Sequence, residues 1–322
     1  MLEFSDFILR SKAYKMVELD ESQARICHAY MFVSKDENYL KKFCEMVSML
    51  LIGKDDDNIC LRIEKHSHPD VLFYGENSNI VVDDISEIIE KSQVTPFEAD
   101  KKIFVLLGSE NMNEASQNKL LKTIEEPPTN TYFILGAKNT SRTLQTILSR
   151  VKLIELDELS SEDIETMLKK AGIEASKAIV YASSANGDAT FAEKLATDDG
   201  FIDFFNSVAA CFYEINGSRD VLKFSNKFTA KTVDKSEFID LFLLISRDLG
   251  MIISGQSELV NFKNLLPKLK VVANTLNLEA VSELIKACVS AKEKLFFNVN
   301  GTSVVDEILF KLAEVKVKCR RS

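Results

Sequence analysis

The sequence predicts an α/β domain built on a parallel sheet, followed by a wholly helical second half. In the first half, short apolar runs alternate with amphipathic helical stretches, which is the pattern of βαβ units whose sheet is covered on both faces. Beyond about residue 157 the strand patterns stop and apolar residues recur at helical spacing. Only 11 Gly and 5 Pro occur in 322 residues, so a mainly β architecture rich in turns is not expected.

Five short apolar runs are the expected strands: Ala29–Val33, Val71–Tyr74, Lys102–Leu107, Tyr132–Gly136 and Lys152–Leu156. The expected helices between them include Asn38–Leu51, Ile85–Gln93 and Glu114–Glu125. Asn113 is a suitable N-cap for the last of these helices. Pro127-Pro128 cannot continue a helix, so this helix should end before them.

Three short helices are expected next, over residues 162–170, 175–184 and 189–196. Ser160 with Asp163 resembles a capping box before the first helix, and Gly172 closes that helix. Asn186-Gly187-Asp188 separates the other two. From Phe201 the chain is expected to be helical throughout, because apolar residues repeat with the period of a core-facing helix.

The composition limits the partners of the chain. Apolar residues make up 46% and charged residues 28%, which indicates a soluble globular protein, and the net charge is −9. A protein that binds DNA alone concentrates basic residues against the phosphates, so any DNA contact here should be shared with partners. The one basic cluster lies at the C-terminal end, where a solvated helix end and a nucleic-acid contact both remain open: Lys311, Lys316, Lys318, Arg320 and Arg321.

Neither a membrane span nor a zinc site is expected. No apolar run approaches about 18 residues without a charge, and the acidic N-terminus lacks the layout of a signal peptide. Most of the six cysteines lie in apolar stretches, as do buried thiols of a reducing cytoplasm, where the chain is expected to reside. Cys60, His66 and His68 are the only metal-like grouping, and three ligands at this spacing with no fourth nearby are insufficient for structural zinc.

The chain has no phosphate loop after its first expected strand. Such a loop reads G-x-x-x-x-G-K-[ST], because glycines let backbone N–H groups converge on phosphates that Lys and a hydroxyl-bound Mg²⁺ also contact. Here the sequence continues Ser34-Lys35-Asp36-Glu37-Asn38, and no Gly occurs before Gly53. Asp36 and Glu37 suit a helix N-terminus but would repel a triphosphate.

The magnesium side of a nucleotide site is also missing. The third expected strand runs into Gly108-Ser109 in place of the carboxylates that orient the metal and the attacking water, and Glu110 stands one place late. Because two independent parts are absent, the sequence predicts that the chain itself does not use ATP. An ATPase with an atypical site is the alternative, and it would need cations such as Lys35, Lys41, Lys42 or Lys54.

Several segments occur together in an order that is more specific than any of these patterns. They are His28-Ala29-Tyr30-Met31-Phe32, His68-Pro69-Asp70-Val71, residues 119–128 (KLLKTIEEPP), residues 131–135 (TYFIL) and residues 146–150 (TILSR). In this order they closely resemble the bacterial DNA polymerase III clamp-loader family, whose pattern reads N-A-L-L-K-T-L-E-E-P-P, then F-I-L, then T-I-x-S-R-C. The matches cover residues 28–157, and the helical C-terminal part is similar in layout only.

The resemblance implies a RecA-like AAA+ domain over residues 1–157, a three-helix lid over 158–199 and an all-α collar over 200–322 through which subunits assemble. Since the phosphate loop is absent, it points to the delta-prime subunit, which has no catalytic activity of its own within the DNA polymerase III holoenzyme. The implied partners are the gamma/tau and delta subunits, the sliding clamp, and primed DNA reached through the assembled complex. The complex loads the clamp by using ATP during replication.

The resemblance also assigns site residues. In the family the Arg of the Ser-Arg motif, here Arg150 after Ser149, acts in trans on ATP held by a neighbouring gamma/tau subunit. A guanidinium placed on the γ-phosphate stabilises charge in the transition state. Glu125-Glu126-Pro127-Pro128 is expected to face a neighbouring subunit, although a helix terminator alone would also explain it.

The chain departs from the family pattern at two places, and the second changes the expectation of a zinc site. Val151 replaces the usual Cys, and the family's four-cysteine zinc module near residues 54–68 is reduced to Cys60, so no zinc is expected. A further alternative is a scaffold of another AAA+ replication or repair assembly, in which the Ser-Arg motif has no active role.

Overall fold

The computed structural model describes residues 2–76, 78–230, 232–297 and 299–321, and the chain folds into two compact units. The first contains residues 1–160 together with 187–190. The second contains residues 161–186 and 191–322. The division after residue 160 lies close to the expected end of the α/β domain at residue 157. The expected lid–collar boundary at residues 199/200 stays a prediction.

The first unit is built on a sheet of five parallel strands in the order β2-β3-β4-β1-β5. The strands are β1 (Ala29–Val33), β2 (Val71–Tyr74), β3 (Lys102–Leu107), β4 (Thr131–Ala137) and β5 (Lys152–Glu155). Three of them have the expected bounds, β4 is one residue longer at each end, and β5 is one residue shorter. Every residue of β3 is buried, as expected for an inner strand covered on both faces.

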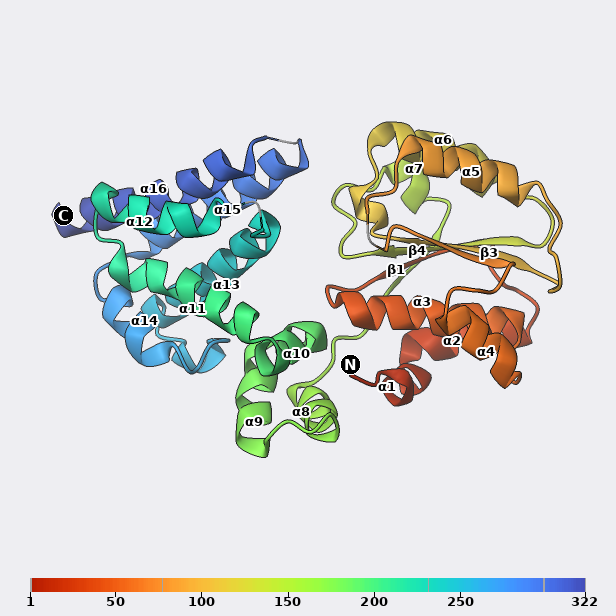
Figure 1. Ribbon diagram of the computed structural model, residues 1–322, viewed down its shortest axis with the longest axis horizontal. Coiled ribbons are helices and arrows are strands. Elements are labelled where there is room, and N and C mark those ends of the chain that lie inside the picture. Colours follow the sequence, from red (N-terminus) through yellow and green to blue (C-terminus); the bar gives the residue numbers. More distant parts are fainter. Residues whose placement is uncertain (1, 77, 231, 298, 322) are drawn as a thin grey trace. The chain divides into compact units, whose positions relative to one another are not determined.

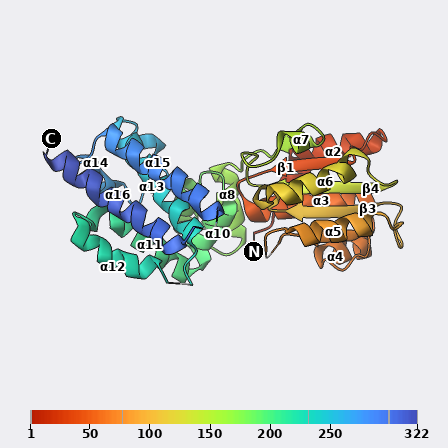
Figure 2. The ribbon, with the colours of Figure 1, turned by 90° about the horizontal axis from the view of Figure 1, so that it is seen from above.

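Helices cover both faces of this sheet (Figure 1). On one face lie α1 (Ser5–Arg10), α2 (Lys12–Ser22), α3 (Glu37–Ile52) and α4 (Asp57–Glu64). On the other lie α5 (Val82–Ser92), α6 (Glu114–Glu125) and α7 (Gln145–Leu148), which Figure 2 shows from above. The predicted cap of α6 is confirmed, because the Asn113 side chain accepts the N–H of Ser116 at 2.8 Å.

The sequence did not indicate α1, α2 or α4, because these helices are short and much of their surface is polar. For α2 and α4, the N-cap residues were the available signal. Ser11 accepts the N–H of Tyr14 at the start of α2, and Asp56 accepts two N–H groups at the start of α4. Ser and Asp are among the preferred residues at this position.

The second unit consists of helices, and it has no strand among its described residues. They are α8 (Ser161–Lys170), α9 (Ala175–Ser184), α10 (Ala189–Thr197, whose first two residues belong to the first unit), α11 (Asp199–Glu214), α12 (Ser218–Phe228), α13 (Lys235–Ile253), α14 (Leu266–Ala273), α15 (Leu278–Phe296) and α16 (Gly301–Arg321). The three short helices predicted after residue 160 are present to within one residue. Asn186 and Gly187 make the expected break between α9 and α10, both with positive φ. No helix among the described residues is long and apolar enough to cross a membrane.

The expectation of continuous helix after Phe201 is wrong over residues 254–265, where only the 3₁₀ turn Ser257–Leu259 forms. A buried carboxylate holds this segment. Asp248 of α13 accepts the backbone N–H groups of Asn261 at 3.0 Å and Phe262 at 2.9 Å. Phe262 is itself fully buried, so the segment carries core side chains although it is not helical.

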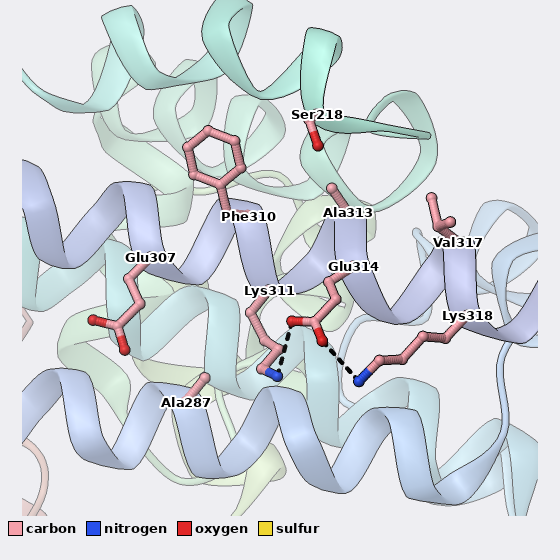
Figure 3. A pocket seen from close by; sticks show the side chains of 9 residues that line it. All are labelled: Ser218, Ala287, Glu307, Phe310, Lys311, Ala313, Glu314, Val317 and Lys318. Carbon is pink, nitrogen blue, oxygen red and sulfur yellow. Dashed lines mark hydrogen bonds and ion pairs between the residues drawn. The ribbon is translucent and has the colours of Figure 1, made fainter.

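The basic C-terminal segment is not simply a solvated helix end. Lys316 is only 3% exposed, and its Nζ donates to the backbone carbonyls of Phe212 and Ile215 at the end of α11. Lys311 and Lys318 both pair with Glu314, as Figure 3 shows. The carbonyl oxygens at a helix C-terminus lack intrahelical partners, so a buried ammonium there both satisfies them and favours the dipole.

A second buried carboxylate, within the first unit, accepts N–H groups from the first residues of two helices, α3 and α10. Asp36 is 1% exposed, and its Oδ1 accepts the N–H of Tyr39 at 3.0 Å, which caps α3. Its Oδ2 accepts the N–H groups of Ala189 at 2.7 Å and Thr190 at 3.2 Å, which open α10. The Thr190 hydroxyl also donates to Oδ1. One side chain therefore serves as the acceptor for two helix N-termini.

Replacing Asp36 should cost more stability than replacing an ordinary N-cap. Asp36→Ala leaves buried N–H groups of two helices unpaired, so the free energy of unfolding should fall by roughly 2 kcal/mol or more. Asp56→Ala, which removes the exposed cap of α4 alone, should cost about 1 kcal/mol. Urea unfolding of both variants, followed by circular dichroism, measures the two losses. Equal losses would contradict the double role of Asp36.

Lys316 should make the stability of the chain depend on pH. Burial lowers the pKa of Lys316 from 10.5 to about 8. Between these two values the unfolded chain binds more protons than the folded chain, so stability rises with pH. Relative to Lys316→Met, the free energy of unfolding of the natural chain should rise by up to about 3 kcal/mol from pH 8 to pH 10.5.

Urea unfolding at pH 7.5, 9 and 10 tests this, because the other titrating groups cancel in the difference between variants. Lys318→Met is the matched control. Hydrogen bonding to Glu314 raises the pKa of the Lys318 side chain, so this comparison should show no rise in the same window. A difference for Lys316→Met that is independent of pH would contradict the prediction.

Candidate functional site

The place where a phosphate would sit in a P-loop protein is occupied by a side chain of the chain itself. Residues 34–36 connect β1 directly to α3, and the Ser34 Oγ accepts the N–H of Asp36 at 3.2 Å. The N–H groups of a helix N-terminus are the usual ligands of a bound phosphate. In this chain, N–H groups in the first turns of α3 and α10 already donate to the Asp36 carboxylate.

Further carboxylates surround this position. Glu37 lies in the first turn of α3 and pairs with Lys138 at 3.0 Å. Glu110 follows the end of β3, and burial raises the pKa of its carboxyl group. Ser109, in the place expected for a metal-binding carboxylate, donates from Oγ to the carbonyl of Gly136 at 3.1 Å. The position that an anion would take is therefore filled by a carboxylate of the protein, and further acidic side chains lie beside it.

The lysines that an atypical nucleotide site would need do not gather at one point. Lys54 follows the C-terminal end of α3, whereas Lys35 precedes its N-terminal end. Each of the four candidate cations is paired with a carboxylate: Lys35 with Glu158 at 2.7 Å, Lys41 with Glu76 at 2.6 Å, Lys42 with Glu64 at 2.5 Å and Lys54 with Glu18 at 2.8 Å. The geometry therefore gives no support to the alternative of an ATPase with an atypical site.

Cys60, His66 and His68 have separate surroundings. Cys60 lies near backbone carbonyls of the α3–α4 turn, and the ring of His66 lies between Glu45 at 3.3 Å and Glu76 at 2.8 Å. His68 is buried, and burial lowers the pKa of its ring. Across the described ranges, no group of three or more His, Cys, Asp or Glu side chains is arranged to hold a metal ion.

The Ser-Arg motif lies at the surface, between α7 and β5. Ser149 caps the C-terminal end of α7, and Arg150 follows with a side chain that is 37% exposed. The Arg150 Nε forms an ion pair with Glu125 Oε1 at 2.6 Å. Its Nη1 donates to the carbonyl of Thr146 at 2.9 Å and to Ser149 Oγ at 3.1 Å. The Nη2 nitrogen makes no hydrogen bond to any described residue.

The structure brings Glu125, Ser149 and Arg150 together out of the six predicted site residues. Glu126 is exposed and makes the last helical hydrogen bond of α6, from its N–H to the carbonyl of Lys122 at 3.0 Å. Pro127 and Pro128 are partly buried and lead toward β4. The proline pair thus ends α6 as predicted, and no contact here tests whether these residues face another subunit.

Two pairings in this region were not found from the sequence. The Glu125–Arg150 ion pair spans 25 residues, and the tie from Asp36 to the start of α10 spans about 150 residues. The N-cap preference of Asp was the one readable signal for the second pairing, and it indicates only the α3 end.

The sequence comparisons agree in matching the chain to subunits of DNA polymerase III. The sequence family described as DNA polymerase III, delta subunit, matches residues 9–160. Subunit delta′ of DNA polymerase III from Bacillus subtilis is 26% identical over 325 residues, which cover 95% of this chain and 97% of that protein. Its counterpart from Haemophilus influenzae is 32% identical over 146 residues, 45% of each chain.

Other similarities are partial or loose. The DNA polymerase III subunit gamma of Buchnera aphidicola is 35% identical over 111 residues, which cover 34% of this chain and 31% of that protein. Among solved structures, a gamma subunit-related protein from Thermotoga maritima has a TM-score of 0.46 at 16% identity over 97% of each chain, a likeness too loose to inform function.

The five-stranded parallel sheet with helices on both faces, followed by a mostly helical region, is the architecture that the sequence predicted. The similarity to delta′ runs nearly the full length of both chains, whereas the gamma match covers a third of this one. Taken together, these similarities support a clamp-loader subunit of DNA polymerase III that is similar over nearly its whole length to delta′.

Proposed function

We propose that this clamp-loader subunit binds no ATP of its own and supplies Arg150 to ATP held by a neighbouring gamma/tau subunit. The observation that carries the proposal is the guanidinium of Arg150, which is held at the surface with Nη2 unbonded to any described residue. An Arg that reaches another subunit's triphosphate stabilises the charge that develops on the transferred phosphoryl group.

The filled anion position supports the first half of this proposal. A triphosphate at the N-terminus of α3 would have to displace the Asp36 carboxylate from the N–H groups it accepts, and it would meet Glu37 and Glu110 nearby. The subunit then contributes no catalytic activity of its own and needs neither ATP nor zinc as a cofactor. It acts as a component of the DNA polymerase III holoenzyme.

The proposed partners are the gamma/tau and delta subunits, the sliding clamp, and primed DNA reached through the assembled complex, in the cytoplasm. The net charge of −9 and the pairing of Lys311 and Lys318 with glutamates support DNA contact through the complex rather than by this chain alone. A groove of about 590 Å³ between α12, α15 and α16 exposes Phe310, which supports assembly through the helical region.

Removing the Arg150 guanidinium should slow the assembled complex without unfolding this chain. In a reconstituted complex, Arg150→Ala should lower ATP hydrolysis stimulated by DNA and clamp by roughly tenfold or more, short of the 10³ seen for a fully engaged finger, because the complex has several sites. Arg150→Lys should remain low, since an ammonium lacks the planar fork. Steady-state ATPase assays on complexes of verified composition measure both effects.

Lys91→Ala is the matched control, because Lys91 is an exposed cation of the same unit paired with Glu87. It should leave ATP hydrolysis unchanged. If Arg150→Ala leaves hydrolysis unchanged in an intact complex, the chain is a scaffold and the proposed role of Arg150 is wrong.

The isolated chain should bind neither ATP nor ADP at micromolar concentrations. Isothermal titration calorimetry with Mg²⁺ present tests this on the full-length protein. Micromolar binding that is lost in Lys35→Ala, Lys41→Ala or Lys42→Ala would instead establish the atypical nucleotide site and contradict the proposal.

A further inference from the structure

We propose that Glu125 is a positioning residue for Arg150: its carboxylate fixes the guanidinium so that the Nη2 edge is presented to an anion. The inference rests on the proposed role of Arg150 toward a neighbouring subunit's ATP. It assigns to the first Glu of the E-E-P-P run a function within its own chain, separate from any contact that this run makes with another subunit.

The hydrogen bonds leave one edge of the guanidinium available. A guanidinium carries five N–H donors, one on Nε and two on each terminal nitrogen. Nε lies 2.6 Å from Glu125 Oε1 in an ion pair, and Nη1 has two acceptors, the carbonyl of Thr146 and Ser149 Oγ. The remaining pair of donors is on Nη2, and it has no acceptor among the described residues. An oxyanion would therefore meet Nη2 and not Nε.

Both partners are mounted on a rigid base. Glu125 is the last residue of α6, and Arg150 lies two residues after the end of α7. Ile124 of α6 and Ile147 of α7 are fully buried and belong to the same apolar cluster. Because close-packed protein interiors deform little, the backbone positions of Glu125 and Arg150 are fixed relative to one another. The carboxylate can thus define where the guanidinium lies.

Stability does not account for this ion pair. The side chains of Arg150 and Glu125 are 37% and 41% exposed. Ion pairs at such exposure contribute little to folding. An arginine side chain, however, samples many rotamers when it is free, and ordering it before a ligand arrives removes that cost from the catalytic step. The pair is therefore better suited to preorganising Arg150 than to holding the fold.

Two substitutions of Glu125 separate positioning from charge. In the reconstituted complex, Glu125→Ala should lower the kcat of DNA- and clamp-stimulated ATP hydrolysis by about three- to tenfold, because the side chain must then be ordered during the reaction. The KM for ATP should change by less than about twofold, since the nucleotide is held by the neighbour. Glu125→Gln keeps an acceptor for Nε and should stay within about twofold of the natural complex in kcat.

A double-mutant cycle and a matched control complete the test. Glu125→Ala should cause no further loss in an Arg150→Ala background, because its effect acts through that side chain. Glu165→Ala removes the partly exposed Glu165–Lys169 pair of the second unit and should leave kcat unchanged.

The outcomes distinguish this inference from the function on which it rests. If Arg150→Ala has no effect, the proposed function fails first. If Arg150→Ala slows hydrolysis while Glu125→Ala matches or exceeds the natural rate, the positioning role alone is overturned. The positioning role is also overturned if Glu125→Ala lowers kcat equally in the natural and Arg150→Ala backgrounds, because that result indicates an independent interface contact. It is overturned as well if the kcat of Glu125→Gln is as low as that of Glu125→Ala.

Discussion

The hydrogen bonds to the Asp36 carboxylate are the interaction on which the β1–α3 connection and the starts of α3 and α10 depend. This carboxylate closes the β1–α3 connection in three residues and accepts N–H groups from the starts of both α3 and α10. Helix N-termini that converge on one point create a strongly attractive place for an anion, and leaving it empty would bury unpaired donors. A side-chain carboxylate satisfies these donors internally, so the arrangement of the two helix N-termini is kept without a bound phosphate.

The same device recurs at two other buried aspartates. Asp70 accepts the N–H groups of residues 97–99 at 2.6–3.0 Å, and Asp248 ties residues 261 and 262 to α13. Burial acts to raise the pKa of both carboxyl groups. The three N–H bonds outweigh it at Asp70, whose pKa is lowered, but the two bonds at Asp248 do not. Irregular segments are thus held by aspartate side chains that accept backbone N–H groups from residues distant in the sequence, not by regular hydrogen-bond ladders.

The sequence was sufficient where the structural signal is local. Strand runs such as Lys102–Leu107, the Asn113 cap and the Pro127-Pro128 stop depend on near neighbours, and they lie where predicted. The Asp36 tie to α10, the burial of Lys316 against α11 and the Glu125–Arg150 pair depend on residues 25 to about 150 positions apart. No periodicity carries such information. The motif resemblance predicts a role for Arg150, and the structure adds which donors of its guanidinium are already engaged.

A bound phosphate would occupy the α3 position to an extent set by mass action, so its presence would vary with the concentration of free nucleotide. Asp36 directly precedes α3 and accepts the N–H of Tyr39, so the effective concentration of its carboxylate there is fixed by the chain itself. The first turns of α3 and α10 consequently keep one arrangement at any ratio of ATP to ADP. The arrangement of this edge of the fold therefore does not depend on the concentration of free nucleotide.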